Sequence, residues 1–346
     1  MRNPDHYLQH LYDSVKPAEG FEARTPEEWQ AWRARLKEQF VRLLGVPEGR
    51  QELAPVLLES VDCGSYTRER IAISTFGPLT MPAYVLIPKT YDRERGAVIA
   101  IHGHGYGSRD LVGLNPDGSE KTGDDPGYQR NFALELVRRG HLTIVPELLG
   151  FGDRRLAEDA EKGDSCYRLS TNLLMMGQTM AGHRVFETLR CVDYVLSRGD
   201  AAPDRIGCMG ISGGGLVSAF AAAIDERLAA AVVSGYANTF QASILSVHHC
   251  IDNFIPGLSQ LAELPDLLGL IAPRPLLIEA GTEDPIFPVA AADEAHDKLR
   301  AIYRQSNAET LLAYDRFEGD HQISGKLAFD WFAGIWPTRE VQHERA

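Results

Sequence analysis

The first fifty residues carry the hydrophobic pattern of helices. In TPEEWQAWRARLKEQFVRLLG, apolar side chains recur every three or four positions, which predicts a helix with one buried face. These apolar positions are Trp29, Trp32, Leu36, Phe40 and Leu43. Thr25 and Glu28 predict a capping box around Pro26 at the helix start, and Gly45 with Pro47 is expected to end the helix.

After residue 67 the pattern becomes that of strands. RERIAIST and PAYVLIP, joined through FGPLTM, predict an antiparallel hairpin. GAVIAIHG is a continuous apolar run, as expected for a strand buried on both faces. From there strand and helix patterns alternate to the C-terminus, which predicts an α/β fold with a doubly wound, mostly parallel sheet and helices on both faces.

The alternation defines the remaining elements. The predicted strands are HLTIVPE, RIGCMGI, LAAAVVSG, RPLLIEAG and TLLAYDRFEG. The predicted helices are YQRNFALELVRRG, one long helix over residues 171–198, GGLVSAFAAAI, VAAADEAHDKLRAIYRQ and GKLAFDWFAGI. Two stretches, 106–127 and 236–272, do not fit the alternation. Both follow strand ends, where open α/β sheets build ligand sites, so we expect them to form the rim or lid of a pocket.

Composition excludes several classes of function. The 346 residues are 44% hydrophobic and 24% charged, with a net charge of −13, which argues against nucleic-acid binding because no basic surplus neutralises phosphates. No apolar run approaches the roughly 18 residues of a membrane span, and the N-terminus lacks the apolar core of a secretory signal. We therefore expect a cytoplasmic protein that binds neither membrane nor nucleic acid.

The five cysteines are scattered along the chain, and no two of them show CxxC spacing. They are Cys63, Cys166, Cys191, Cys208 and Cys250. Neither a disulfide framework nor a zinc ribbon is expected from this arrangement.

The stretch RIGCMGISGGG holds a single serine between glycines. Gly210, Ser212 and Gly214 match G-x-S-x-G, with a predicted strand before the motif and a predicted helix after it. A strand that turns directly into a helix presses backbone against backbone, so a side chain at either glycine would clash. The strained bend lifts the serine hydroxyl above the sheet. Ser212 is therefore the predicted nucleophile.

A serine needs a base and an orienting acid to act as a nucleophile. In proteins with this type of bend, the acid comes later in the sequence than the serine, and the base comes later still. Each lies just after a strand. Asp284 lies just past RPLLIEAG, and His321 just past TLLAYDRFEG. Glu283 and Asp320 are the alternative acids, although Asp320 adjoins His321 and cannot easily reach the far side of its ring.

Two backbone N–H groups are expected to form an oxyanion hole. Gly213 offers one, because N–H groups at a helix start lack partners within the helix. The loop HGHGYG offers the other, which we assign to His104; its imidazole could instead line the pocket.

Two pairs of neighbouring histidines are candidate metal ligands. They are His102 with His104 and His248 with His249. Neither pair has i, i+4 spacing or clustered carboxylates, so no metal is expected.

These motifs resemble those of the α/β-hydrolase superfamily, and more closely its dienelactone-hydrolase and acetyl-xylan-esterase-like branch of bacterial serine esterases. The similar stretches span residues 97–321 and are IHGHGYG, VPELLGFGDRR, GHRVFETLRCVDYVLSR, DRIGCMGISGGG, IAPRPLLIEAGTEDPIFP and EGDH. The N-terminal helical region is also similar to that branch. Dienelactone hydrolases proper use a cysteine nucleophile, so Ser212 argues against that activity. Asp153, Arg154 and Arg184, within the branch's structural signatures, are expected to form an ion-pair network beneath the site.

The resemblance implies an α/β-hydrolase domain over residues 51–346, with an insert around 236–272 and a helical extension over 1–50. It implies hydrolysis of small or carbohydrate-linked esters through an acyl-serine, without a cofactor. Tyr106 and Phe254 are candidate substrate-binding residues, with Tyr128 and Phe240 as further aromatics near the irregular stretches. Stacking on a sugar and simple hydrophobic lining of the pocket are equally open roles for these rings. The expected partner is a small-molecule ester, and a homo-oligomer is an open alternative to a monomer.

Two other functions stay open at this point. A serine peptidase of the same fold is one, although the segment before Arg68 is too short and too helical for the extra β-propeller domain of such peptidases. A non-enzymatic binding protein is the other, although it would have no need of an intact serine, aspartate and histidine set.

Overall fold

The computed structural model describes residues 4–47, 49, 51–123 and 125–336. Nine strands form one sheet in the order β1-β2-β3-β5-β4-β6-β7-β8-β9 within this part of the chain. The strands are β1 (Val56–Asp62), β2 (Tyr66–Ser74), β3 (Thr80–Pro88), β4 (Ala97–Ile101), β5 (Leu142–Pro146), β6 (Ile206–Ile211), β7 (Ala230–Ser234), β8 (Leu276–Gly281) and β9 (Leu312–Phe317). The pairs β1–β2, β2–β3 and β3–β5 are antiparallel. The pairs from β5–β4 to β8–β9 are parallel.

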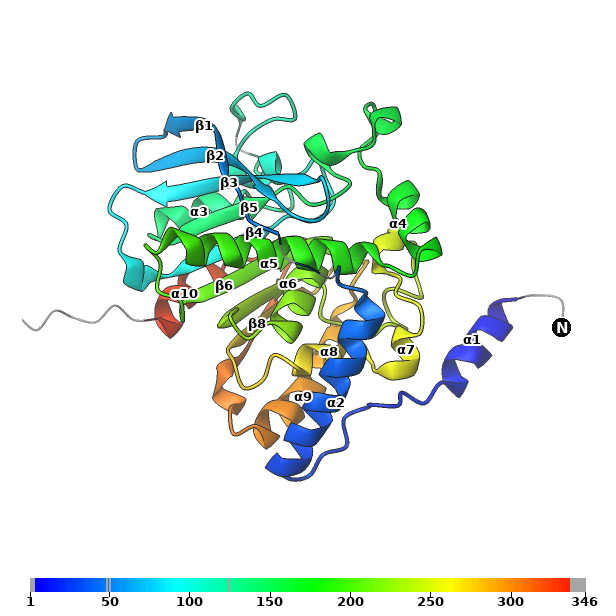
Figure 1. Cartoon of the computed structure of the whole chain (residues 1–346). Coiled ribbons are helices and arrows are strands. Elements are labelled where there is room, and N and C mark those ends of the chain that lie inside the picture. Colours follow the sequence, from blue (N-terminus) through cyan, green and yellow to red (C-terminus); the bar gives the residue numbers. More distant parts are fainter. Residues whose placement is uncertain (1–3, 48, 50, 124, 337–346) are drawn as a thin grey trace, which may run out of the picture.

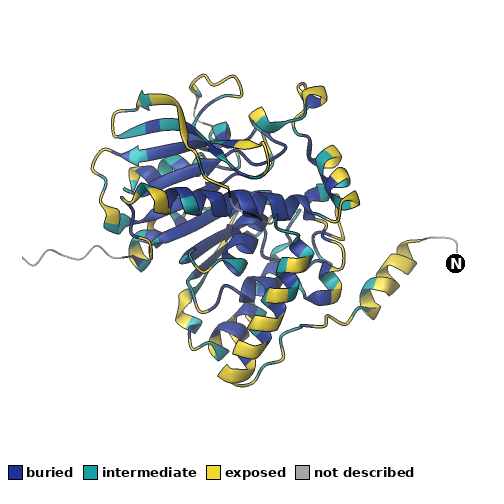
Figure 2. Cartoon of the chain, viewed as in Figure 1, coloured by how far each residue is buried: buried dark blue, intermediate teal, exposed yellow. Residues whose placement is uncertain are grey.

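Helices cover both faces of the sheet, which confirms the doubly wound α/β fold (Figure 1). Helices α2 (Pro26–Leu44), α5 (Met180–Arg198), α6 (Gly213–Ile224), α8 (Leu264–Gly269) and α9 (Val289–Gln305) share one hydrophobic core with one face of the sheet. Helices α3 (Phe132–Arg138) and α10 (Ala328–Ile335) pack in a second core on the other face. Strands β4 to β8 are buried along their whole length (Figure 2), because helices cover both of their faces.

The predicted hairpin is present, and the structure adds a strand to it. Strands β2 and β3 are paired along their whole length, from Tyr66 opposite Pro88 to Ser74 opposite Thr80. The added strand, β1, pairs with β2 at the edge of the sheet and is almost wholly exposed. Its residues bury no apolar face, so they lack the alternation by which a strand is recognised in sequence.

Helix α2 ends as its sequence predicts, but only half of the predicted capping box forms at its start. The Thr25 hydroxyl accepts a hydrogen bond from the Glu28 N–H, while the Glu28 carboxylate accepts from Arg24 N–H instead of closing a capping box on Thr25. Gly45 ends the helix in a left-handed conformation with φ of 63°. The predicted apolar face is buried in the core, with Leu44 fully buried in place of Leu43.

The single helix predicted over residues 171–198 is wrong. The structure has two helices there, α4 (Cys166–Met175) and α5. Gly177 turns the chain with φ of 73°, and Thr179 caps a new helix by accepting a hydrogen bond from Gly182 N–H at 2.9 Å. A turn and a cap therefore interrupt an apolar pattern that reads as continuous.

The irregular stretch 236–272 packs partly against α4 and partly against α6 and α9. It contains a short helix at Ile251–Asn253, α7 (Leu258–Leu261) and α8. Helix α1 (Asp5–Ser14) precedes α2 and has no buried residue. Among the described residues, no helix combines the length and apolar character needed to cross a bilayer.

Candidate active site

Ser212 sits on the sharp bend between β6 and α6. Its φ of 56° and ψ of −123° are strained for a residue with a side chain. A Cβ at Gly210 would lie 2.1 Å from the Gly214 carbonyl oxygen, and a Cβ at Gly214 would lie 2.1 Å from the Ile101 carbonyl oxygen. The glycines of the motif are therefore required by the close approach of three backbone segments.

His321 and Asp284 meet beside this bend. The Nδ1 atom of His321 is 2.7 Å from Oδ2 of Asp284. The other oxygen of Asp284 accepts hydrogen bonds from the N–H groups of Ile286 and Phe287 at 2.8 and 2.9 Å. With both oxygens fixed, Asp284 can hold the ring in one tautomer, with Nε2 unprotonated.

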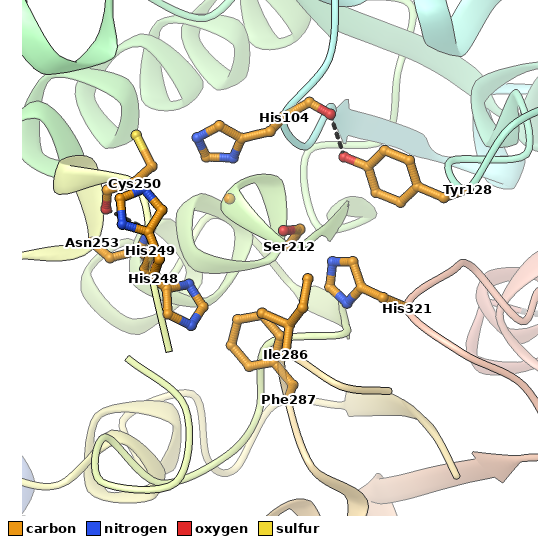
Figure 3. A pocket seen from close by; sticks show the side chains of 11 residues that line it. His104, Tyr128, Ser212, His248, His249, Cys250, Asn253, Ile286, Phe287 and His321 are labelled. Carbon is orange, nitrogen blue, oxygen red and sulfur yellow. Dashed lines mark hydrogen bonds between the residues drawn. The ribbon is translucent and has the colours of Figure 1, made fainter. Parts of the chain in front are cut away.

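Aromatic rings enclose His321 on both sides. Tyr128 and Phe287 stack on it with ring centroids 5.8 and 5.6 Å away. Gly235 lies at its edge, where a Cβ would come within 3.0 Å of the ring. The Nε2 atom is buried and has no hydrogen-bond partner among the described residues. Figure 3 shows the ring beside Ser212.

A cavity of about 290 Å³ opens above Ser212. Its lining residues are His104, Tyr128, Ser212, Gly213, His248, His249, Cys250, Asn253, Ile286, Phe287 and His321. A larger groove of about 880 Å³ adjoins it and shares His104, His248, His249 and Cys250 with it. Phe254 lines this second groove rather than the cavity.

Three of the remaining sequence candidates are placed as follows. Gly213 is the first residue of α6, so its N–H has no partner within the helix. The His104 carbonyl accepts a hydrogen bond from the Tyr128 hydroxyl at 2.6 Å, which fixes the loop after β4 (Figure 3). Tyr106 is not among the described residues that line the cavity; its hydroxyl donates to Leu114 O at 2.9 Å.

The expected ion-pair network exists, with partners that the sequence does not identify. Arg184 pairs with Asp252, and Arg154 pairs with Glu187; all four side chains are buried. Asp153 takes no part in these buried pairs, since it lies half exposed and pairs with two partly buried arginines, Arg70 and Arg109. The insert, through Asp252, is thus tied to α5 by a buried charge pair.

Four potential metal donors lie together next to the cavity. They are His104, Cys166, Cys250 and Asp252, whose donor atoms all lie within 4.8 Å of one another. These donor types suit zinc. However, the Arg184 guanidinium donates to Asp252 and, at 3.0 Å, to Cys166 Sγ. Two of the four donors already bind a cation, so we assign no metal to this cluster.

Two of the histidines considered from sequence, His102 and His249, have other partners. Burial lowers the pKa of His102 to about 4, and its Nε2 accepts the Leu148 N–H at 3.2 Å. Nε2 of His249 lies 3.1 Å from the Ser243 hydroxyl.

Sequence reasoning missed Phe287, Cys250 and Asp252 as parts of the site. Phe287 lies three residues after Asp284, so its place in the same loop is a local signal that could have found it. Asp252 and Cys250 lie in the insert, which has no periodicity from which the direction of a side chain could be predicted.

Comparison with known proteins agrees with this architecture. A Bacillus subtilis protein named "Putative hydrolase YtaP" is 28% identical over 296 residues, covering 84% of this chain and 94% of that protein. A structure named as a "putative acetyl xylan esterase" from Bacteroides fragilis superposes with a TM-score of 0.78 at 18% identity, over 92% of this chain and 83% of that one. A glucuronoyl esterase from Solibacter usitatus has a TM-score of 0.67 at 14% identity, over 94% of this chain and 100% of that one.

These structural likenesses show a shared fold. The model of the Abhydrolase family matches residues 6–298, which is most of the chain. The protein therefore belongs to the Abhydrolase family.

Proposed function

We propose that the protein is a serine carboxylic ester hydrolase that works through an acyl-serine intermediate. One observation carries this proposal: Ser212, on a strained bend, shares a cavity with His321, whose ring is held by Asp284. This is the arrangement of nucleophile, base and orienting acid that serine hydrolases use.

Each group has one role in the proposed reaction. Ser212 Oγ attacks the ester carbonyl while Nε2 of His321 takes its proton, and Asp284 stabilises the imidazolium. The carbonyl oxygen becomes an oxyanion that accepts hydrogen bonds from the N–H groups of Gly213 and His104. His321 then returns the proton to the leaving alcohol. Water, activated by the same histidine, hydrolyses the acyl-serine.

The two neighbouring spaces support a substrate with one small and one larger part. The cavity of about 290 Å³ suits a short acyl group or a single ring, and the groove of about 880 Å³ offers room for an extended alcohol or sugar. The names of the similar structures, an acetyl xylan esterase and a glucuronoyl esterase, support carbohydrate-linked esters. We propose acetylated sugars as the first substrates to test. Phe254, at the groove, is a proposed sugar contact.

A fluorophosphonate probe tests the nucleophile. The wild type should be labelled and should hydrolyse p-nitrophenyl acetate, whereas Ser212→Ala should do neither. Ser197→Ala, which removes a hydroxyl near the far end of α5, is the matched control and should behave as the wild type. Equal labelling of the wild type and Ser212→Ala would refute the proposal. Hydrolysis of peptide p-nitroanilides in place of esters would point to the peptidase alternative.

Three further expectations accompany this function. The cytoplasmic location and the oligomeric state stay predictions, which cell fractionation and analytical ultracentrifugation would test. Likeness to dienelactone hydrolases also stays a prediction at the level of sequence motifs.

A further inference from the structure

A second histidine–aspartate pair faces Ser212 from the side opposite His321. Nε2 of His104 lies 3.4 Å from Oδ2 of Asp252, and Asp252 is only 4% exposed. Figure 3 shows Ser212 between the rings of His104 and His321. The proposed mechanism uses the backbone N–H of His104 but gives its side chain no role.

The Asp252 carboxylate is rigidly held. Arg184 donates to one of its oxygens, and the Asn253 side chain donates to the other at 2.8 Å. Arg184 is itself anchored, because its Nε and Nη2 both donate to the Leu149 carbonyl at 3.0 and 2.8 Å. The insert thus delivers a fixed negative charge to the His104 ring.

The other edge of the His104 ring lies against the start of α6. A Cβ at Gly213 would lie 3.0 Å from Nδ1 and 3.1 Å from Cε1 of this ring. With Nε2 turned to Asp252, Nδ1 is the nitrogen nearest to the residue whose N–H is the proposed oxyanion donor. Glycine at position 213 leaves the space that the ring occupies.

The surroundings keep this ring positively charged. Burial alone would lower the pKa of His104, but the charge and hydrogen bonding of Asp252 outweigh burial, and with Cys166 they raise the pKa to about 10. The neighbouring Cys250 thiol is the largest influence on the Cys166 thiol and, with Arg184, lowers its pKa to about 6. The charged and titratable groups around the ring are Asp252, Arg184, Cys166, Cys250, His102 and His249.

We propose that the His104 side chain, as an imidazolium held by Asp252, stabilises the oxyanion that forms when Ser212 attacks the ester. This inference rests on the proposed esterase function. A cation fixed beside a developing negative oxygen lowers the reaction barrier without reorganising during the step. A protonated ring cannot accept the serine proton, so His104 does not duplicate the base. Asp252 is then a positioning residue that acts through His104.

His104→Gln separates the side chain from the backbone, because it keeps the backbone N–H and removes the charge. We expect kcat for p-nitrophenyl acetate to fall by roughly 10- to 100-fold, with KM within about three-fold. This is less than the roughly 100- to 1,000-fold loss for removing a whole oxyanion-hole donor, because both backbone N–H groups remain. His296→Gln, the same change at a ring stacked on Tyr314 of β9, should leave kcat unchanged. A kcat for His104→Gln within about three-fold of the wild type would overturn the proposal.

Asp252→Asn tests the positioning role. Asparagine keeps the shape but not the charge, so the pKa of His104 should fall and kcat should become pH-dependent in the neutral range, decreasing as pH rises. The double variant with His104→Gln should lose no more activity than His104→Gln alone. If the losses of the two single variants multiply in the double variant, Asp252 acts through a group other than His104.

Two measurements keep the outcomes distinct. If the wild type is neither labelled by fluorophosphonate nor active on esters, the proposed function itself fails. If the wild type is active and His104→Gln has the same kcat, only this inference fails. Nitrogen-15 NMR of the wild type needs no variant to fold. It should show both ring nitrogens of His104 protonated at pH 8, and a neutral ring at that pH would refute the imidazolium.

Discussion

Two histidine rings flank Ser212, and each is held by a buried aspartate in a different way. Asp284 receives two neutral N–H donors and bonds Nδ1 of His321, leaving Nε2 toward the serine. Asp252 is held by a guanidinium and contacts Nε2 of His104, leaving Nδ1 toward the start of α6. The same two residue types can thus provide a base that exchanges a proton and a cation that keeps one, depending on which nitrogen is free and what surrounds the pair.

The sharpest contrast is in the loss expected when each pair is broken. His321→Ala and Asp284→Asn should each lower kcat by at least roughly 100-fold, because proton transfer to and from Ser212 depends on them. This loss should exceed that of His104→Gln and Asp252→Asn in steady-state assays of the same ester. Near-normal rates in either variant would reassign the base or the acid, with Glu283 and Asp320 as the next acids to test.

The pH dependence of the wild type should report the charge on His104. Its pKa is raised from the ordinary 6.5 to about 10, so the ring is charged at neutral pH and loses its charge only as pH rises through about 10. We expect kcat to fall as pH rises through this range, by up to the factor lost in His104→Gln. This decrease is the alkaline limb of the pH profile, and it should be absent from His104→Gln. Cys166→Ser should move the limb to lower pH, because the Cys166 thiolate also favours the charged ring. An identical limb in His104→Gln would assign the limb to another group.

The glycines beside the two rings should respond differently to a methyl group. Gly213→Ala would push the His104 ring by a few tenths of an ångström while favouring the helix start, so we expect roughly a three- to ten-fold loss of kcat with little change in melting temperature. Gly235 has φ of 50°, so Gly235→Ala should also lower the melting temperature as it crowds His321. Thermal unfolding and kinetics on both variants check this. An unaltered melting temperature for Gly235→Ala would contradict it.

A similarly small effect is expected at Tyr128, which connects the two sides of the site. Tyr128→Phe keeps the ring stacked on His321 but removes the hydroxyl bonded to the His104 carbonyl. Loss of one hydrogen bond of about 1 kcal/mol corresponds to roughly a five-fold decrease in kcat. Tyr128→Leu, which removes both contacts, should lose more. Equal rates for the two variants would show that only the ring matters.

Much of the architecture was predictable because it depends on local rules. Buried strands read as apolar runs, Thr25 and Gly45 bound α2, and G-x-S-x-G marks a bend that only glycines allow. Strand β1 and the break between α4 and α5 were not predictable in this way. An exposed edge strand has no hydrophobic alternation, and a turn at Gly177 with a cap at Thr179 can interrupt a pattern that otherwise continues.

By itself, the sequence determined the strands of the sheet other than β1, the bend at Ser212 and the order in which Asp284 and His321 follow, because strand ends are local features and parallel strands bring their ends to one edge. Only the tertiary structure decided that Asp252, from an insert without periodicity, meets His104 and Arg184. Such a meeting depends on how an irregular segment folds back over the sheet, and on the balance between burial and paired charge. In the proposed mechanism, that balance gives two chemically identical side chains different roles on either side of Ser212.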